Sequence, residues 1–172
     1  MAAFRFKLEM VPRSFLGEKP MEAINMELLQ EGIEPWTAAR QPSQRSIDRL
    51  QKLLPKNTSW GKTEEFVSNS EWGSKLRIWH HDDGLISNIE FGYSALSGDW
   101  HLMQAFASIA QADNCLLVDC TTGAIVEPNE EQVKAHFTTS NAALFVVDPN
   151  EAMRRASANI RMPKFVEDEE KE

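Results

Sequence analysis

Several sequence patterns that mark a specific function are missing from this chain of 172 residues. It has only two cysteines, no apolar run approaching ~18 residues and no cluster of lysine and arginine. The glycine-rich phosphate-binding patterns and the Gly-x-Ser-x-Gly nucleophile pattern do not occur either. These absences argue against a membrane span, a disulfide framework, nucleic-acid binding and the common nucleotide-binding and hydrolase classes.

Negative charge exceeds positive charge, and the formal net charge is −8. Half of that excess lies at 167–172, where five side chains are acidic and one is lysine. Such a run cannot bury apolar surface, so we predict a disordered acidic tail at 164–172 after a single domain at 1–163. The mild acidity of the remainder favours a basic protein partner and disfavours nucleic acid.

The two cysteines, Cys115 and Cys120, are five residues apart in a segment with strand character. An odd separation places them on opposite faces of an extended strand. The spacing does not match the Cys-x-x-Cys pattern of zinc and redox sites, so we expect two reduced thiols, at least one buried, with no metal and no cofactor. The N-terminal residues lack the apolar core of a signal peptide, and we therefore expect a cytoplasmic protein without membrane association.

The most informative segment that is present is 75–92, which predicts a β-hairpin. Asp83-Gly84 suits the two positive-φ positions of a type I′ turn, so that Asp82 would face Leu85. The resulting register separates an apolar face from a polar one: Leu76, Ile78, Ile89 and Phe91 on the first, and Arg77, Trp79, His81, Asn88 and Glu90 on the second.

Periodicity and capping residues predict the other elements. Apolar side chains alternate with charged ones from Phe4 to Met10, which is typical of a strand with one buried face. We predict helices at 20–31, at 44–54, from Ser97 or Asp99 to about Asp113, from Asn129 onward and from Pro149 onward, together with a short strand at 65–68, a second hairpin at 115–118 and 124–127, and a buried segment at 142–147.

This order of elements is not the strict strand–helix alternation of a parallel doubly wound sheet. Two hairpins separated by a helix instead favour an antiparallel arrangement. We therefore predict an α+β fold, with an antiparallel sheet built from the N-terminal strand and two β-hairpins and with helices packed mainly on one face.

Ionisable side chains are densest near the turn of the first hairpin. His80, Asp82 and His101 are the candidate catalytic residues, and they support a small enzyme if the helix that contains His101 folds over the hairpin end. Adjacent histidines on a strand point to opposite sides, so we predict no metal site at this position. A separate option is a cysteine nucleophile with His136 as its base and Asp119 as the orienting residue, although the neighbours of both cysteines are apolar.

The predicted binding residues are those of the polar hairpin face. Aromatic side chains and arginine are enriched at binding hot spots, and Trp79 would lie beside a cross-strand Arg77/Glu90 pair. His81 and Asn88 complete the set. The alternative is that another element covers this face and that Trp79 belongs to a second core layer.

Residues 70–154 also carry a recognisable order of motifs. A Trp-Gly pair precedes the first hairpin, a helix opens with Asp-Trp, and Ser-Asn-Ala-Ala-Leu-Phe-Val-Val-Asp-Pro precedes the last helix. This order resembles small uncharacterised bacterial cytoplasmic α+β proteins, some of which are similar to immunity proteins of toxin systems. The resemblance implies a non-catalytic binding role and assigns no functional residue.

Three functions follow as hypotheses. The first is a non-catalytic protein-binding or inhibitory, immunity-like protein that uses a sheet face or a hairpin end, with a basic partner. The second is the small enzyme with a His/Asp site near residues 80–101. The third is a structural or assembly subunit, for which the strand at 4–10 would offer an edge for pairing.

Overall fold

A computed structural model describes residues 4–16, 35–70 and 72–158. The helix predicted at 20–31 and the acidic tail predicted at 164–172 lie outside these residues. Within them, the strands are β1 Arg5–Pro12, β2 Thr63–Val67, β3 Lys75–His80, β4 Ile86–Ser94, β5 Cys115–Asp119 and β6 Ile125–Val126. The helices are α1 Arg13–Leu16, α3 Gln44–Gln51, α4 Trp100–Ala112, α5 Glu130–Thr138, α6 Asn141–Val147 and α7 Pro149–Ala158.

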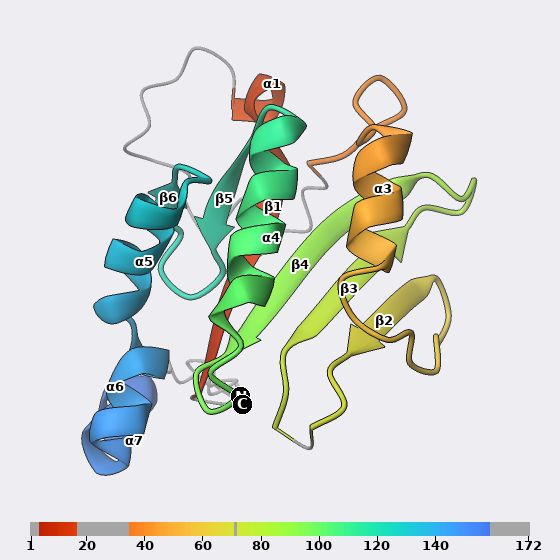
Figure 1. Ribbon diagram of the computed structural model, residues 1–172. Coiled ribbons are helices and arrows are strands. Elements are labelled where there is room, and N and C mark those ends of the chain that lie inside the picture. Colours follow the sequence, from red (N-terminus) through yellow and green to blue (C-terminus); the bar gives the residue numbers. More distant parts are fainter. Residues whose placement is uncertain (1–3, 17–34, 71, 159–172) are drawn as a thin grey trace, which may run out of the picture.

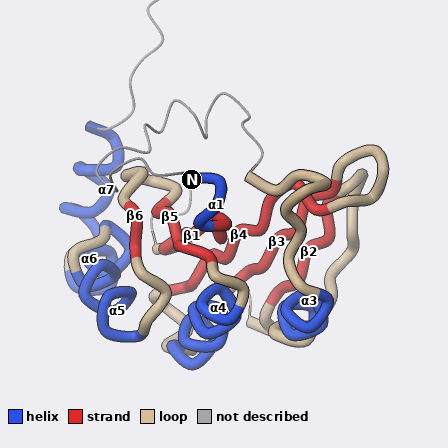
Figure 2. Tube along the Cα trace, turned by 90° about the horizontal axis from the view of Figure 1, so that it is seen from above, coloured by secondary structure: helices blue, strands red, loops and turns tan. Residues whose placement is uncertain are grey.

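The strands form a single antiparallel sheet in the order β2-β3-β4-β1-β5-β6 (Figure 1). Figure 2 shows α3, α4 and α5 side by side along one face of that sheet. The predicted α+β class, with its antiparallel sheet and helices mainly on one face, is therefore confirmed. No helix among the described residues is long and apolar enough to span a membrane.

Strand β1 occupies the middle of the sheet and pairs with β4 on one side and with β5 on the other. Its alternation explains this position, because Phe4, Phe6, Leu8 and Met10 are all buried on the side of the helices. Since β4 pairs with residues 5–9 of β1 and β5 pairs with residues 8–12, β1 is an interior strand of the sheet and not an edge strand. This position does not favour the pairing edge on which the assembly hypothesis relied.

The first hairpin has the predicted register in its middle and a different turn at its end. Leu76 pairs with Phe91, and Trp79 pairs with Asn88, as expected. The turn, however, has three loop residues: the Gly84 amide donates to the His81 carbonyl, and the His81 amide donates to Leu85. Within this turn only Gly84 has a positive φ, of 85°, so this is a type I turn followed by a glycine bulge and not the type I′ turn that we predicted.

A second irregularity restores the register beyond the turn. His80 pairs with Ile86 whereas Trp79 pairs with Asn88, so Ser87 is an extra residue in β4. The bulge is stabilised from outside the hairpin, because the side-chain amide of Gln41 donates to the Ile86 carbonyl and accepts from the Ile86 amide, each at 2.9 Å. The longer turn shifts the strand register by one residue, and the bulge at Ser87 shifts it back by one, so the pairing from Leu76 to Trp79 is the predicted one.

The main core lies between the sheet and the helices, and aromatic rings join its elements. Phe91 of β4 stacks on Phe106 of α4 with their centroids 5.0 Å apart. Phe137 of α5 packs against Tyr93 and Trp100 at 5.4 and 5.3 Å. These contacts fix α4 and α5 on the sheet.

Several boundaries differ from the sequence prediction. Helix α3 begins as expected after Ser43, whose side chain accepts from the Ser46 amide, but it ends three residues before Leu54. Strand β2 begins two residues before the predicted strand. Its outer edge is covered, because the Asn57 amide donates to Glu65 and the Val67 amide donates to Pro55.

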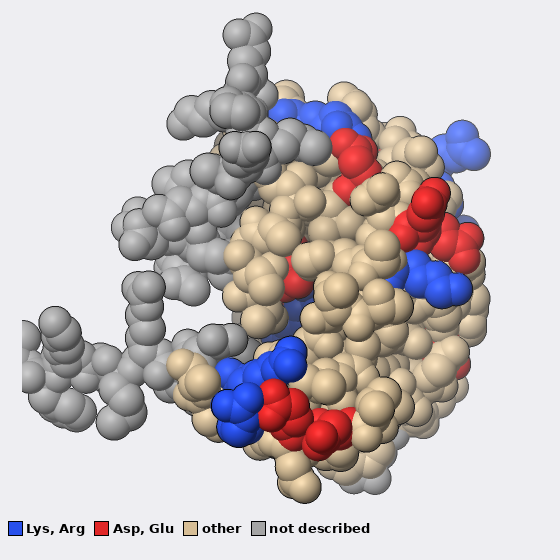
Figure 3. All heavy atoms as spheres, turned by 90° about the vertical axis from the view of Figure 1, so that its left-hand side faces the viewer, with Lys and Arg blue, Asp and Glu red and all other residues tan. Residues whose placement is uncertain are grey.

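The segment at 142–147 is a helix, α6, and the prediction that it is buried is wrong. Val146 is 52% exposed and Val147 is 84% exposed, and only Ala142 is fully buried. On the adjoining helix α7, Glu151 pairs with Arg154 and Arg155. Figure 3 shows this side of the molecule as largely uncharged, with small groups of opposite charge in contact.

The stacked pair at the centre of the core gives a direct test of the fold. We expect Phe106→Ala to lower the free energy of unfolding by about 3–5 kcal/mol, because it removes a fully buried ring and leaves a cavity against Phe91. Urea denaturation measures this change. The control is Val147→Ala, which should change stability by less than about 0.5 kcal/mol at an exposed position. Equal effects of the two substitutions would contradict this packing.

Candidate functional site

The sheet face that points away from α3, α4 and α5 is polar along β1, β3 and β4. We refer to it as the polar sheet face. Arg77, Trp79, Asn88 and Glu90 lie there as the sequence predicted, and each is half-buried. Because β1 is next to β4, the face also includes side chains from the start of the chain: Arg5, Lys7 and Glu9.

Ion pairs hold the centre of the polar sheet face. The guanidinium of Arg77 donates to Glu65 of β2 at 2.8 Å and lies 3.8 Å from Glu90. Lys7 lies 3.6 Å from Glu90 on the other side. Burial alone would raise the pKa of Glu65, but Arg77, Asn57 and Lys75 outweigh it and hold the pKa below its ordinary value. Arg77 is thus committed to neighbouring carboxylates.

An open hollow of about 330 Å³ lies in this face beside the hairpin. We refer to it as the Trp79 hollow. It is lined by residues of β1, β3 and β4, five of which carry polar or charged side chains next to the indole: Glu9, Trp79, His80, Ser87, Asn88 and Glu90. Three of the five predicted binding residues, Trp79, Asn88 and Glu90, therefore share one concave surface.

Glu9 is the residue of this hollow that sequence reasoning missed. One of its carboxylate oxygens accepts from the Asn88 side-chain amide at 2.7 Å. Burial raises the pKa of Glu9, the hydrogen bond from Asn88 opposes that shift, and the nearby Glu90 adds to it. The alternation of β1 already placed Glu9 on a polar face, but only the strand order shows that β1 and β4 are neighbours.

His81, the remaining predicted binding residue, is directed elsewhere. Its Nε2 lies 3.1 Å from the carbonyl oxygen of Trp36. The residue lines a separate depression of about 410 Å³ at the hairpin end, which is formed by Thr37, Ala38, His81, Asp82, Asp83 and Leu85. The structure therefore divides the predicted binding set between two places.

The three candidate catalytic residues do not meet at one point. His80 has Nδ1 at 3.1 Å from the Gly84 carbonyl and Nε2 at 3.2 Å from Glu64. Asp82 is exposed at the turn and pairs with Lys62. His101 follows the far end of β4, which is nine residues long and so spans roughly 26 Å. The helix end that contains His101 does not fold over the hairpin end.

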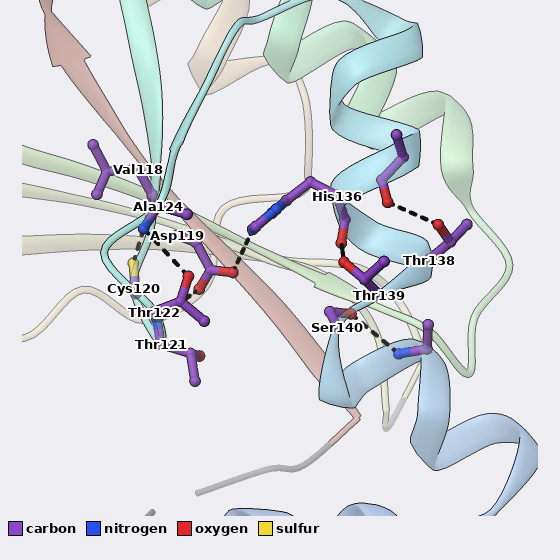
Figure 4. Close-up of polar contacts among 12 residues, drawn as sticks. Val118, Asp119, Cys120, Thr121, Thr122, Ala124, His136, Thr138, Thr139 and Ser140 are labelled. Carbon is purple, nitrogen blue, oxygen red and sulfur yellow. Dashed lines mark hydrogen bonds and ion pairs between the residues drawn. The ribbon is translucent and has the colours of Figure 1, made fainter. Parts of the chain in front are cut away.

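No group of three or more histidine, cysteine, aspartate or glutamate side chains converges suitably for a metal ion anywhere in the described ranges. His136 and Asp119 do meet, as Figure 4 shows: His136 Nε2 lies 2.7 Å from Asp119 Oδ2. The other carboxylate oxygen of Asp119 accepts from the backbone amides of Thr121 and Thr122 at 2.7 and 3.2 Å. This pair fastens α5 to the turn between β5 and β6.

Neither cysteine completes a catalytic group with this pair. Cys115 is four residues from Asp119 along β5, roughly 13 Å away, and burial raises the pKa of its thiol to about 12. Cys120 directly follows β5, its amide donates to the Lys7 carbonyl, and its charged neighbours are Glu90, Glu9 and Lys7, so it lies on the polar sheet face, opposite to Asp119. Burial also raises the pKa of Cys120, and Glu90 and Glu9 add to that shift. Both thiols are protonated at neutral pH, which does not suit a nucleophile.

Comparison of this chain with protein-family models, with curated proteins and with solved structures finds no match.

The buried Asp119 carboxylate gives a pH-dependent prediction. Burial would raise its pKa, but hydrogen bonds from His136, Thr121 and Thr122 hold the pKa below its ordinary value. We expect Asp119→Asn to lower the free energy of unfolding by about 2 kcal/mol at pH 7, since charged hydrogen bonds are lost. Because the folded pKa is the lower one, the stabilisation is complete above the unfolded value, about 3.9, and disappears as pH falls through the folded pKa.

Urea denaturation of the wild type and of Asp119→Asn between pH 3 and pH 7 measures the two free energies of unfolding and tests this prediction. The control is Asp48→Asn at an exposed carboxylate of α3, which should have little effect at any pH. If the difference in free energy of unfolding between the wild type and Asp119→Asn grows as the pH falls, the predicted direction of the Asp119 pKa shift is wrong.

Proposed function

We propose that this chain is a non-catalytic binding protein and that it contacts a basic protein partner through the polar sheet face at the Trp79 hollow. The observation that supports this most directly is the hollow itself, which places an indole beside two carboxylates. Aromatic side chains in concave, partly desolvated positions are typical anchors of protein interfaces. An inhibitory, immunity-like role is the form of binding that the sequence resemblance suggests.

The remaining chemistry of the described residues also favours binding over catalysis. The rings of His80, His81 and His136 contact Glu64, Trp36 and Asp119 respectively, and the two thiols are held protonated. These groups have structural partners in the fold. The net charge of −8 would steer a basic partner towards the protein and speed encounter. We also propose a cytoplasmic location, in keeping with two free cysteines.

Replacing the anchor tests the proposed function. We expect Trp79→Ala to weaken binding of the partner by at least about tenfold, which corresponds to more than about 1 kcal/mol, because the indole loses its contact area at the centre of the interface. The partner is isolated by affinity capture on the wild-type protein and identified, and its dissociation constant is then measured by calorimetry.

The matched control is Trp60→Ala. Trp60 is 59% exposed and lies in the loop before β2, so its removal should leave affinity unchanged. Circular dichroism and thermal unfolding of all variants separate lost binding from lost fold. If folded Trp79→Ala retains the partner with wild-type affinity, the proposed surface is wrong. If Trp79→Ala does not fold, Trp79 belongs to a second core layer.

A further inference from the structure

The lining of the Trp79 hollow points to the chemistry of its occupant. Glu9 and Glu90 are acidic, and none of the residues that line the hollow is lysine or arginine. Lys7 and Arg77 lie 3.6 and 3.8 Å from the same oxygen of Glu90 and form ion pairs with it. Glu9, in contrast, has no ion pair with a lysine or arginine among the described residues, so it is the carboxylate of this hollow whose charge the surrounding face leaves unpaired.

Glu9 has acceptor capacity left over. The amide of Asn88 donates to its Oε1, whereas no side chain or backbone amide among the described residues donates to Oε2. A carboxylate can accept about four hydrogen bonds, so a bound donor would find free lone pairs here. The raised pKa of Glu9 has burial as its main cause, which places this carboxylate where a cation would be held strongly.

Trp79 provides a second contact for a bound cation, through the face of its indole ring. A cation above the face of an indole is attracted by the ring quadrupole, and arginine uses this contact more often than lysine does. A guanidinium is planar and carries five donors in a fixed fork, so it can stack on an aromatic ring while it donates to a carboxylate at its edge. The depression at the hairpin end has no tryptophan, tyrosine or phenylalanine in its lining, and its Asp82 already pairs with Lys62.

We propose that the Trp79 hollow binds an arginine side chain of the basic partner, with the guanidinium stacked on Trp79 and hydrogen-bonded to Glu9. This inference rests on the proposed function and identifies the anchor that the partner supplies. Asn88 positions the Glu9 carboxylate by its hydrogen bond, and Glu90 lines the same hollow with its charge paired to Lys7 and Arg77.

A small probe tests this proposal without the partner. N-acetyl-arginine methylamide is titrated into the full chain while the indole N–H signal of Trp79, assigned with Trp79→Phe, is followed by NMR. We expect a saturable shift with a millimolar dissociation constant. The same molecule with citrulline in place of arginine keeps the shape and loses the charge, and we expect it to bind at least tenfold more weakly.

Glu9→Gln is the matched variant, since it keeps the size of the side chain and the acceptor for Asn88 but removes the charge. It should weaken the arginine probe at least fivefold and leave thermal stability near that of the wild type. The control is Glu131→Gln, at an exposed position on α5, which should bind as the wild type does. The proposal is overturned by equal binding of arginine and citrulline probes, by undiminished binding to Glu9→Gln, or by the absence of a saturable shift.

These outcomes can be separated from those of the partner experiment. If Trp79→Ala abolishes partner binding while the arginine probe fails, the contact surface stands and the arginine anchor is wrong. If the arginine probe binds at Trp79 while Trp79→Ala retains the partner, the hollow recognises a guanidinium but the partner binds elsewhere.

Discussion

The structure depends on the pairing of β1 along both of its edges. The strand joins the hairpin β3–β4 to the hairpin β5–β6, which are otherwise separated by α4. A strand in that position must have one face for the helices and one for the opposite side of the sheet, and the alternation from Phe4 to Met10 meets this demand. A slip of one residue would expose Phe6 and Leu8 and bury Lys7 and Glu9. The same alternation that builds the core therefore also builds the polar sheet face.

The features that could be predicted from the sequence are those that depend on neighbouring residues alone, such as helix caps. Ser43 and Asn129 cap their helices because each side chain accepts from an amide three residues later, and such a contact needs no knowledge of the rest of the fold. The first hairpin shows a feature that neighbouring residues alone do not determine. Its turn is one residue longer than predicted, and the bulge at Ser87 compensates only because Gln41, 45 residues away from Ile86, satisfies the freed backbone groups. The register was thus predicted correctly from Leu76 to Trp79, although the predicted turn does not form and His80 pairs with Ile86 instead of the predicted Ser87.

In the candidate site, too, some residues could be predicted from local sequence and others depend on the overall fold. Trp79, Asn88 and Glu90 share a surface because they belong to one hairpin, whose cross-strand neighbours follow from its register. Glu9 is 79 residues from Asn88, and its place in the hollow follows from the strand order, which periodicity does not encode. His81 was predicted on the polar face by alternation alone, but the changed turn and the contact with Trp36 take its ring away. His101 depended on a helix position that could not be derived, and it lies beyond the other end of β4.

The charged groups of the polar sheet face differ in whether they are already paired, and this difference explains how a mildly acidic protein could select one cationic side chain there. Most carboxylates of the sheet have charged or hydrogen-bonded partners: Glu65 pairs with Arg77, Glu64 with Lys56, Glu90 with Lys7 and Arg77, and Asp119 is held by its hydrogen bonds. Paired charges of this kind order the surface but contribute little to the recognition of a partner, because their hydrogen bonds are already made. Glu9 differs, since its partner in the described fold is the neutral amide of Asn88. Long-range attraction to a basic protein is shared by the whole surface, whereas a desolvated carboxylate beside an indole discriminates one cationic side chain from its neutral analogue. The overall charge therefore governs the rate of encounter, and the specificity of the proposed contact rests on Glu9 and Trp79.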